Sequence, residues 1–412
     1  MRGTIASAAA LSALNAPALR AQQAPPDGQS ALPPNVPKWM TEQGEPILSP
    51  AYGQPSKYEK EVVRRATDLT TTNTSSWSFT PLQDLHGIIT PNGLFFERHH
   101  AGVPDIPPDQ HRLMIHGLVA RPLLLSMDEL MRFPSVSRIH FIECSGNTLT
   151  QWKTATQETV QGSHGLLSCV EWTGVPLSTL LQEVGVRPEG KWILAEGADA
   201  AAMTRSIPME KAMDDALVAY GQNGEALRPE QGYPVRLVLP GYEGNTQIKW
   251  LRRLKVGDKP WYTREETSKY TDLMPDGKAR EFSLIMEAKS VITRPTSTDR
   301  LRGAGFYEVS GLAWSGHGRI TRVDVSTDGG DNWQQAQLQE PILPKALTRF
   351  RFPWRWNGEP ALLQSRAIDE TGYVQPTHSD LVRARGTNSV YHYNAIYTWQ
   401  VNPGGEINNV HV

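Results

Sequence analysis

A cysteine at the end of a predicted strand has the clearest chemical potential in this chain. Cys144 follows the short run Phe141–Glu143 and precedes a Ser-Gly-Asn turn at 145–147. The one other cysteine is Cys169, so a framework of several disulfides is impossible, and the paired spacings of zinc ligands are absent. Cys144 is therefore a candidate single thiolate ligand or a nucleophile. The alternative is a buried free cysteine that acts as a small hydrophobe.

A cationic segment upstream offers groups that bind anions. Arg98, His99 and His100 follow an aromatic pair and Glu97. Adjacent side chains on an extended strand point to opposite faces, so a metal site made by both histidines is disfavoured. Guanidinium and imidazole donors suit a cofactor phosphate or an oxyanion, which Arg98 and one histidine can bind. The alternative is a solvated polar turn, because charge clusters are usually surface features.

Two more cations accompany a predicted strand within residues 232–244, between glycine-bearing turns. Arg236 and Lys249 are natural partners for a phosphate. Arg252, Arg253 and Lys255 are expected to form a solvated strand face or a docking patch for an acidic partner. The sequence has no glycine-rich phosphate loop at a strand-to-helix junction. It also has no Cys-x-x-Cys-His motif, so this chain carries no haem c of its own.

The elements that must position these groups predict an α+β domain at 76–265. The pattern predicts strands at Leu113–Leu118 and Trp192–Ala195. Ser126–Arg132 and Leu177–Val184 have helical spacing, each with a serine near the capping position. Short strands that alternate with a few helices are typical of this fold class.

Strand-like segments follow one another beyond residue 281. Arg322–Trp333 alternates up to a glycine-rich turn, which predicts a hairpin. Further strand candidates are Phe306–Trp314, Arg349–Trp354 and Leu362–Ala367. This pattern predicts an immunoglobulin-like β-sandwich at 281–400, followed by a C-terminal tail at 401–412. Such a module usually supports, packs or dimerises.

The first 75 residues differ from the rest of the chain in amino-acid composition. Residues 1–21 hold Arg2, a weakly apolar alanine-rich stretch and small residues, as in the remnant of an export signal. A disordered alanine-rich tail is the alternative, and the second arginine of a twin-arginine signal is absent. Residues 22–75, which open with a stretch rich in Pro, Gln and Ser, are expected to form an extended arm or linker.

Composition limits the partners. The chain has 412 residues, 20% of them charged, and a formal net charge of -2, which gives no general attraction to nucleic acid or to an acidic membrane. No internal stretch approaches the length of a membrane span. Small substrates or a protein partner are therefore expected.

These segments together resemble the sulfite oxidase family of molybdopterin enzymes over about residues 75–400. Four strings carry the resemblance by their order and spacing: SWSFTPL at 76–82, FERHHAGVP at 96–104, FIECSGN at 141–147 and TREETSKY at 263–270. The family joins a cofactor-binding α+β domain to an immunoglobulin-like dimerisation domain. Within it, the likeness is to molybdenum subunits of sulfane dehydrogenases from thiosulfate-oxidising systems.

The resemblance implies roles for particular residues. Cys144 matches the cysteine that supplies a thiolate to molybdenum, a metal suited to soft sulfur ligands. Arg98, Tyr270 and Arg385 match catalytic pocket residues, with Arg385 reaching in from the second domain. Arg236 and Lys249 match positions at the phosphate end of the cofactor. The full set that matches cofactor contacts is Arg98, His99, His100, Asp199, Arg236, Gln247, Ile248 and Lys249.

Departures from the family pattern concern the substrate. Sulfite oxidases usually have arginine after the Gly-Asn of the cysteine motif, where this chain has Thr148 and Leu149. Gln231 stands where the family often has histidine. A pocket with less positive charge fits free sulfite poorly and fits protein-bound sulfane sulfur better.

The resemblance thus implies oxygen transfer to a sulfane sulfur on a carrier protein, with molybdenum and molybdopterin as cofactors. It implies a c-type cytochrome subunit as electron acceptor, a periplasmic location and a homodimer joined through the second domain. The alternatives are a sulfite dehydrogenase acting on free sulfite and a non-catalytic scaffold whose cofactor site has decayed. Cys169 is expected to be a core residue.

Overall fold

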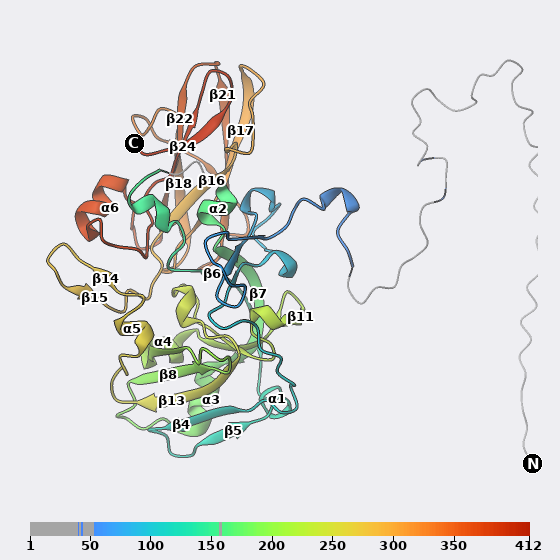
Figure 1. The fold of residues 1–412 in the computed structure, drawn as a ribbon, viewed down its shortest axis with the longest axis vertical. Helices are drawn as coiled ribbons and strands as arrows, with labels where there is room; N and C mark the ends of the chain where they lie inside the picture. The colour runs from blue at the N-terminus through green and yellow to red at the C-terminus, as the bar shows by residue number, and fades with distance from the viewer. Residues whose placement is uncertain (1–39, 41–42, 44–52, 156–158) are drawn as a thin grey trace, which may run out of the picture. The chain divides into compact units, whose positions relative to one another are not determined.

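A computed structural model describes residues 40, 43, 53–155 and 159–412 (Figure 1). The expected export signal at 1–21 and much of the expected arm at 22–75 lie outside these residues. The last part of the arm is described, and it joins a three-stranded sheet. In this sheet Arg65–Ala66 (β1) pairs with Trp77–Phe79 (β2), and β2 pairs with Glu97–Arg98 (β3).

The first domain, from β2 to the helix α5 that ends at residue 267, contains two larger sheets. Their strands are β4 Leu113–Gly117, β5 Leu123–Leu125, β6 Val136–Glu143, β7 Leu167–Pro176, β8 Trp192–Gly197, β9 Thr204–Pro208, β10 Leu217–Gln222, β11 Glu225–Ala226, β12 Arg236–Val238 and β13 Leu251–Gly257. One sheet has the order β5-β4-β13-β8-β9, with β4 and β13 parallel. The other has the order β11-β10-β7-β6, with β12 beside β10. The strands predicted at 113–118 and 192–195 are confirmed as β4 and β8.

Short helices connect these strands. They are α1 Met127–Leu130, α2 Val160–His164, α3 Leu177–Val184, α4 Met209–Asp214 and α5 Arg264–Thr267. The predicted helix at 126–132 is confirmed as α1, where Ser126 caps the helix and Glu129 completes a capping box. The predicted helix at 177–184 is confirmed as α3, but its expected serine cap is wrong. Pro176 is the N-cap residue of α3 and makes no side-chain cap, so Ser178 lies inside the first turn.

The second domain, from β16 to β24, consists of two antiparallel sheets, coloured orange to red in Figure 1. Its strands are β16 Lys289–Arg294, β17 Gly305–Trp314, β18 Ile320–Ser326, β19 Gln334–Gln335, β20 Gln337–Gln339, β21 Thr348–Trp356, β22 Ala361–Asp369, β23 Thr398–Val401 and β24 Ile407–Val410. The orders are β16-β17-β21-β20 and β19-β18-β22-β23-β24. The predicted hairpin at 322–333 is confirmed, because β18 and β19 pair antiparallel. A small hairpin of β14 Asp272–Leu273 and β15 Ala279–Arg280 precedes this domain, and the helix α6 His378–Arg385 lies within it.

The expected C-terminal tail at 401–412 is instead part of this domain. Val401 belongs to β23, and β24 pairs with β23 at the edge of the sheet. Alternate side chains of β24 are buried, with Ile407 and Asn409 facing inward. The Pro-Gly-Gly turn at 403–405 is the hairpin signal that marks this pairing.

One hydrophobic core lies between the two sheets of the second domain and continues into the first domain. Val291 and Phe350 of one sheet meet Leu363 of the other, while Phe141 of β6 and Cys169 of β7 join the same cluster. Cys169 is fully buried there, and burial raises the pKa of its thiol to about 12, which confirms it as a core residue. The strand that leads to Cys144 is thus anchored in both domains.

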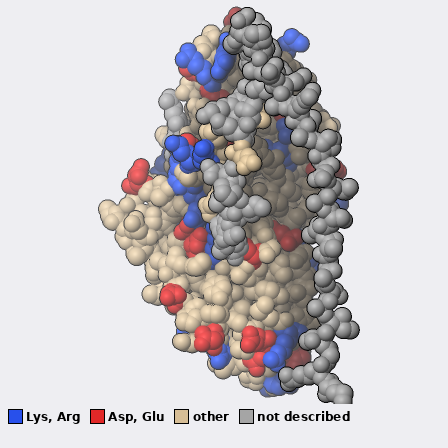
Figure 2. Space-filling model, turned by 90° about the vertical axis from the view of Figure 1, so that its right-hand side faces the viewer, with Lys and Arg blue, Asp and Glu red and all other residues tan. Residues whose placement is uncertain are grey.

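The surface carries charges of both signs. On the face shown in Figure 2, Lys and Arg side chains are interspersed with Asp and Glu over the area not covered in grey. This distribution agrees with the small net charge of the sequence. Among the described helices, none is long and apolar enough to cross a membrane.

Candidate active site

Cys144 lies at the first residue after β6, where the chain turns. Its N–H donates to the carbonyl of Leu166 at 2.9 Å, and its own carbonyl accepts from the N–H of Asn147 at 2.9 Å. The thiol is half-buried and lines two cavities. Burial raises the pKa of Cys144, and the Arg98 cation opposes that effect. A metal ion that coordinates the sulfur would deprotonate it outright.

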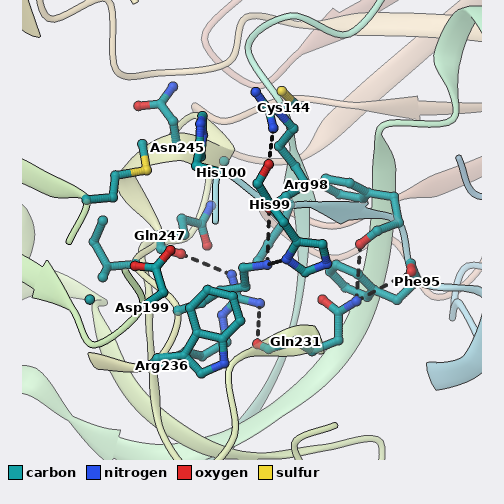
Figure 3. A pocket seen from close by; sticks show the side chains of 18 of the residues that line it. Phe95, Arg98, His99, His100, Cys144, Asp199, Gln231, Arg236, Asn245 and Gln247 are labelled. Carbon is teal, nitrogen blue, oxygen red and sulfur yellow. Dashed lines mark hydrogen bonds between the residues drawn. The ribbon is translucent and has the colours of Figure 1, made fainter. Parts of the chain in front are cut away.

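The first cavity brings together ten of the eleven predicted site residues (Figure 3). Its empty volume, including the solvent space at its mouth, is about 730 Å³. In Figure 3 the sulfur of Cys144 lies at one end of the cavity, and Arg236 lies toward the other. The predicted residues that line it are Arg98, His99, His100, Cys144, Asp199, Arg236, Gln247, Ile248, Lys249 and Tyr270.

The segment around β3 supplies one wall of this cavity. Lys249 Nζ lies 2.9 Å from His99 Nδ1, and His99 Nε2 lies 2.6 Å from a carboxylate oxygen of Glu97. Because a lysine ammonium can only donate, His99 accepts at Nδ1 and donates from Nε2. Burial lowers the pKa of His99, which keeps the ring neutral. Burial and the neighbouring Arg98 lower the pKa of His100 to about 4.

Two cations at the far end of the cavity lack carboxylate partners among the described residues. Arg236 is buried and donates to the carbonyls of Gln231 at 2.9 Å and Gln247 at 3.1 Å, while its Nε has no partner in the described part of the chain. Burial lowers the pKa of Arg236 to about 9, and burial with the Arg236 charge lowers the pKa of Lys249 to about 7. A cation withdrawn from water without a counterion is costly, and a bound phosphate would satisfy both the buried Arg236 and the half-buried Lys249.

Two other polar side chains of the first cavity have different roles: Asp199 can accept hydrogen bonds, and Gln247 is bonded to a backbone carbonyl. Burial raises the pKa of the Asp199 carboxyl, which offers oxygens for N–H donors. The side chain of Gln247 holds the loop by donating to the carbonyl of Tyr242 at 2.9 Å. Gly244 approaches β6 so closely that a Cβ there would lie 2.9 Å from the carbonyl oxygen of Glu143. A glycine is therefore needed where this loop meets the cysteine segment.

Tyr270 follows α5 and points toward the junction of the two cavities. Its hydroxyl lies 3.3 Å from Nε2 of His100, and the Arg205 guanidinium lies 5.5 Å from its ring centroid. Its backbone is left-handed, with φ of 52°. Burial and the nearby Cys144 raise the pKa of Tyr270. The phenol therefore remains protonated and can donate a hydrogen bond at neutral pH.

Arg385 lies at the end of α6 and lines neither cavity among the described residues. Its Nη1 lies 3.4 Å from the carboxylate of Asp272, which also accepts from the N–H of Val390 at 3.1 Å. The structure therefore places Arg385 in an ion pair behind the Tyr270 segment. The expectation that it reaches into the pocket is not met, because Asp272 holds the guanidinium.

Sequence reasoning missed two buried carboxylates that flank the cysteine loop. Glu143 is fully buried and accepts from Lys289 Nζ at 3.0 Å and Trp314 Nε1 at 2.6 Å. Glu243 is also buried, and against the effect of burial Arg205 lowers the pKa of Glu243 to about 2. A lone glutamate inside the apolar run before Cys144 was the one available signal for the first of them.

The second cavity opens on the other side of Cys144. Its empty volume, including the solvent space at its mouth, is about 1490 Å³, and it shares Cys144, Arg98 and Tyr270 with the first cavity. Its rim includes Leu69 and Leu149, which are 80% and 44% exposed. The shared residues mark the junction at which a bound cofactor and an incoming substrate would meet.

Comparison with known proteins identifies both domains. Residues 100–264 match the family described as "Oxidoreductase molybdopterin binding domain", and residues 280–399 match the "Mo-co oxidoreductase dimerisation domain". The chain is 52% identical to a chain of the sulfane dehydrogenase SoxCD from Paracoccus pantotrophus, with a TM-score of 0.90. That alignment covers 92% of this chain and 98% of the Paracoccus chain.

Curated relatives are more distant. Mitochondrial sulfite oxidase of Rattus norvegicus is 33% identical over 314 residues, which cover 70% of this chain and 57% of the rat protein. A nitrate reductase of Nicotiana tabacum is 33% identical over 337 residues, covering 71% of this chain and 37% of the tobacco protein. The chain therefore spans little more than half the length of the sulfite oxidases it matches.

The matched domains, together with the first cavity, which extends from the Cys144 thiol to the Arg236 guanidinium, define a molybdopterin-binding oxidoreductase. The cavity has two cations at one end, where Arg236 Nε has no partner among the described residues, and a thiol at the other end. These groups fit an elongated cofactor with a phosphate and a sulfur-bound metal. More particularly, the chain belongs to the sulfite oxidase family. Molybdenum and molybdopterin are accordingly its cofactors.

Proposed function

We propose that this protein is the molybdenum subunit of a sulfane dehydrogenase. It oxidises sulfane sulfur carried on a partner protein and passes the electrons to a c-type cytochrome subunit. The observation that carries this proposal is the likeness to the SoxCD sulfane dehydrogenase, which extends over nearly the whole of that chain.

The first cavity would hold the cofactor through groups already in place. Arg236 and Lys249 would bind its phosphate, Asp199 and the His99 segment would contact the pterin, and Cys144 would give its thiolate to molybdenum. When bound, the cofactor supplies oxygen-atom transfer to sulfur and storage of two electrons. The protein contributes position, charge and the exclusion of water.

The second cavity supports a carrier-bound substrate. It is larger than the first and has exposed apolar residues on its rim, so an extended protein arm can enter it. Thr148 and Leu149 line it where the family pattern has arginine, which removes a cation that free sulfite would need. Arg98 at the junction retains one charge to orient a terminal anionic sulfur. The protonated Tyr270 hydroxyl can donate a hydrogen bond at the same point.

The remaining parts of the proposal concern assembly. We propose that the two sheets of the second domain form a sandwich of immunoglobulin type and join two copies of the chain. The description of the matched domain as a dimerisation domain supports this. A periplasmic location accompanies the sulfane dehydrogenase role. Light scattering that gives the mass of one chain at working concentration would contradict the homodimer.

The decisive experiment measures turnover of the purified, cofactor-loaded protein. Persulfide sulfur on a carrier protein and free sulfite are compared as substrates, each with and without a c-type cytochrome. We expect cytochrome-dependent oxidation of the carrier-bound sulfur at a higher kcat/KM than that of sulfite. A preference for sulfite would instead identify a sulfite dehydrogenase. Absence of molybdenum in protein from molybdate-replete cells would favour the scaffold alternative.

A further inference from the structure

The loop that carries Cys144 is attached to the second domain by a buried ion pair. Glu143, directly before Cys144, is 0% exposed, and Lys289 of β16 is 1% exposed. Lys289 Nζ donates to Oε1 of Glu143 at 3.0 Å and to Oγ1 of Thr148 at 2.7 Å. One ammonium group therefore contacts the residues at both ends of the segment 143–148, with the cysteine between them.

A tryptophan from the adjacent strand completes this contact. Lys289 and Trp314 are directly opposite in the pairing of β16 with β17, so they act on the same face of that sheet. The Trp314 indole donates to Oε2 of Glu143 at 2.6 Å, so each carboxylate oxygen has its own donor from the second domain. The Asn147 side chain adds a third donor at 3.0 Å.

Thr148 shows why the far end of the loop needs support. Its backbone is left-handed, with φ of 66°, which is uncommon for a residue with a branched Cβ. Its hydroxyl accepts from Lys289, and the carbonyls of Asn147 and Tyr393 both lie within reach of its single proton. These bonds hold the strained turn in one conformation.

The opposite side of the loop is also fixed. Ser145 Oγ accepts from the Asn245 amide at 3.1 Å, and the Ser145 carbonyl accepts from the N–H of His392 at 2.8 Å. Residues on both sides of Cys144 are thus held, and its sulfur is left to face the two cavities.

Stability alone does not account for a buried lysine and glutamate. Removing two charges from water costs several kcal/mol per ion, and apolar replacements of a buried pair are often neutral or stabilising. Groups that orient a metal ligand, in contrast, usually change affinity or activity by about 10- to 100-fold when removed. The geometry of this pair, centred on the cysteine loop, fits the second purpose.

We propose that Lys289 is a positioning residue for Cys144, acting through Glu143 and Thr148. It sets the place of the sulfur at the junction of the cavities, so that the second domain completes the metal site of the first. This proposal rests on the assignment of Cys144 as the molybdenum ligand within the proposed function. It does not depend on which sulfur compound is oxidised.

The test uses cofactor-loaded protein with Lys289→Met, which removes the charge and both hydrogen bonds at similar side-chain length. The readouts are the molybdenum electron paramagnetic resonance spectrum after chemical reduction, cofactor content, and kcat and KM on whichever sulfur substrate the wild type oxidises. We expect altered g values and a kcat lower by about 10- to 100-fold, with KM changed by less than about threefold. Because chemical reduction needs no substrate, the spectrum is informative even if the proposed substrate is wrong.

Lys211→Met is the matched control. Lys211 is likewise a buried lysine, with Nζ 2.5 Å from Asp215 and 2.7 Å from the carbonyl of Pro240, and neither partner belongs to the cysteine loop. The Lys211→Met variant should be less stable than the wild type and should keep the wild-type spectrum and kcat. An equal spectral change in this control would show a general effect of buried-charge loss and overturn the proposal.

Two more variants cover the case in which Lys289→Met fails to fold. Glu143→Gln with Lys289→Met leaves no unpaired charge, and Trp314→Phe keeps the ion pair while removing one donor to Glu143. We expect a changed spectrum in both, smaller for Trp314→Phe. Wild-type spectrum and kcat in a folded Lys289 variant, or in the double variant, would refute the assignment.

Discussion

The two cavities that meet at Cys144 differ in how their surfaces are built. The first is lined by polar groups that are fixed by hydrogen bonds: Lys249 is bonded to His99, and the buried Arg236 is bonded to the carbonyl of Gln247. The second is larger, and exposed apolar residues such as Leu69 and Leu149 lie on its rim. The first is suited to hold one group in one orientation, and the second to admit a partner from outside.

This difference separates two tasks that one cavity would otherwise share. Cofactor retention depends on preorganised charge, and substrate choice depends on the residues around an opening. Substitutions in the first cavity should therefore affect cofactor content, and those in the second should affect KM. Cys144, which belongs to both, should affect every property.

The largest effect is expected at Cys144, one of the three residues that line both cavities. Cys144→Ser removes the soft thiolate ligand, so turnover should fall by more than the roughly 100-fold typical of outer partners, while the fold remains intact. Steady-state kinetics and circular dichroism check this. Cys169→Ala is the control, since it changes a buried cysteine in the core and should keep wild-type turnover. Full activity in Cys144→Ser would refute the ligand assignment.

The next effect belongs to the first cavity alone. Arg236→Met removes a charged donor set, and hydrogen bonds to charged groups contribute about 1.5 to 3 kcal/mol each. Cofactor affinity should fall by about 10- to 100-fold, measured as molybdenum and pterin content after dialysis.

Arg349→Met provides the comparison for Arg236→Met. Arg349 is also buried and donates to the carbonyls of Leu85 at 2.7 Å and Gly87 at 2.9 Å, and none of these three residues lines either cavity. It should lower the melting temperature and retain the cofactor. Equal cofactor loss in both variants would show that the cavity charge is not responsible.

The second cavity is tested by adding the charge it lacks. Leu149→Arg places a guanidinium at the opening, and one charge-assisted hydrogen bond should lower KM for sulfite by about tenfold. Cofactor content should not change. Leu124→Arg, at a 55% exposed position on β5 that lines neither cavity, should leave KM unchanged. An unchanged KM in Leu149→Arg would mean that the second cavity does not select the substrate.

The smallest effect is a pH dependence in the first cavity. Burial lowers the pKa of Lys249 to about 7, whereas a lysine in the unfolded chain keeps its proton to about pH 10.4. Between these values the unfolded chain binds more protons, so the free energy of unfolding of cofactor-free protein rises with pH. Urea unfolding at pH 6.5 and 9 should show a larger gain for wild type than for Lys249→Met. Equal gains would show that Lys249 is not desolvated.

The sequence predicted most of the local structure because its signals are local. The strand and turn at Cys144 and the hairpin at 322–333 follow from alternation and glycine-rich turns within a dozen residues. Ten of the eleven site residues lie around one cavity. Five of these ten stand in the four family strings: Arg98, His99, His100, Cys144 and Tyr270. The prediction that Cys169 is a core residue is also confirmed.

The predictions failed where the position of a residue or strand depends on a partner that is distant in the sequence. Arg385 was expected in the pocket, but its ion pair with Asp272 joins residues 113 positions apart. The edge strand β24 was expected to be a tail, because a four-residue strand has little alternation of its own and the Pro-Gly-Gly turn at 403–405 is its one local signal. The role of Glu143 could not be predicted, because Lys289, the cation with which it pairs, lies in the other domain.

The contact between Glu143 and Lys289 has a consequence for biosynthesis. It spans 146 positions, and at translation rates of about 5 to 20 residues per second the lysine emerges roughly 7 to 30 s after the glutamate. During that interval Glu143 lacks its two donors from the second domain, Lys289 and Trp314. If Lys289 positions Cys144 as proposed, we expect the metal group to be loaded after the second domain has been synthesised, and we expect the first domain expressed alone to be a poor acceptor for it.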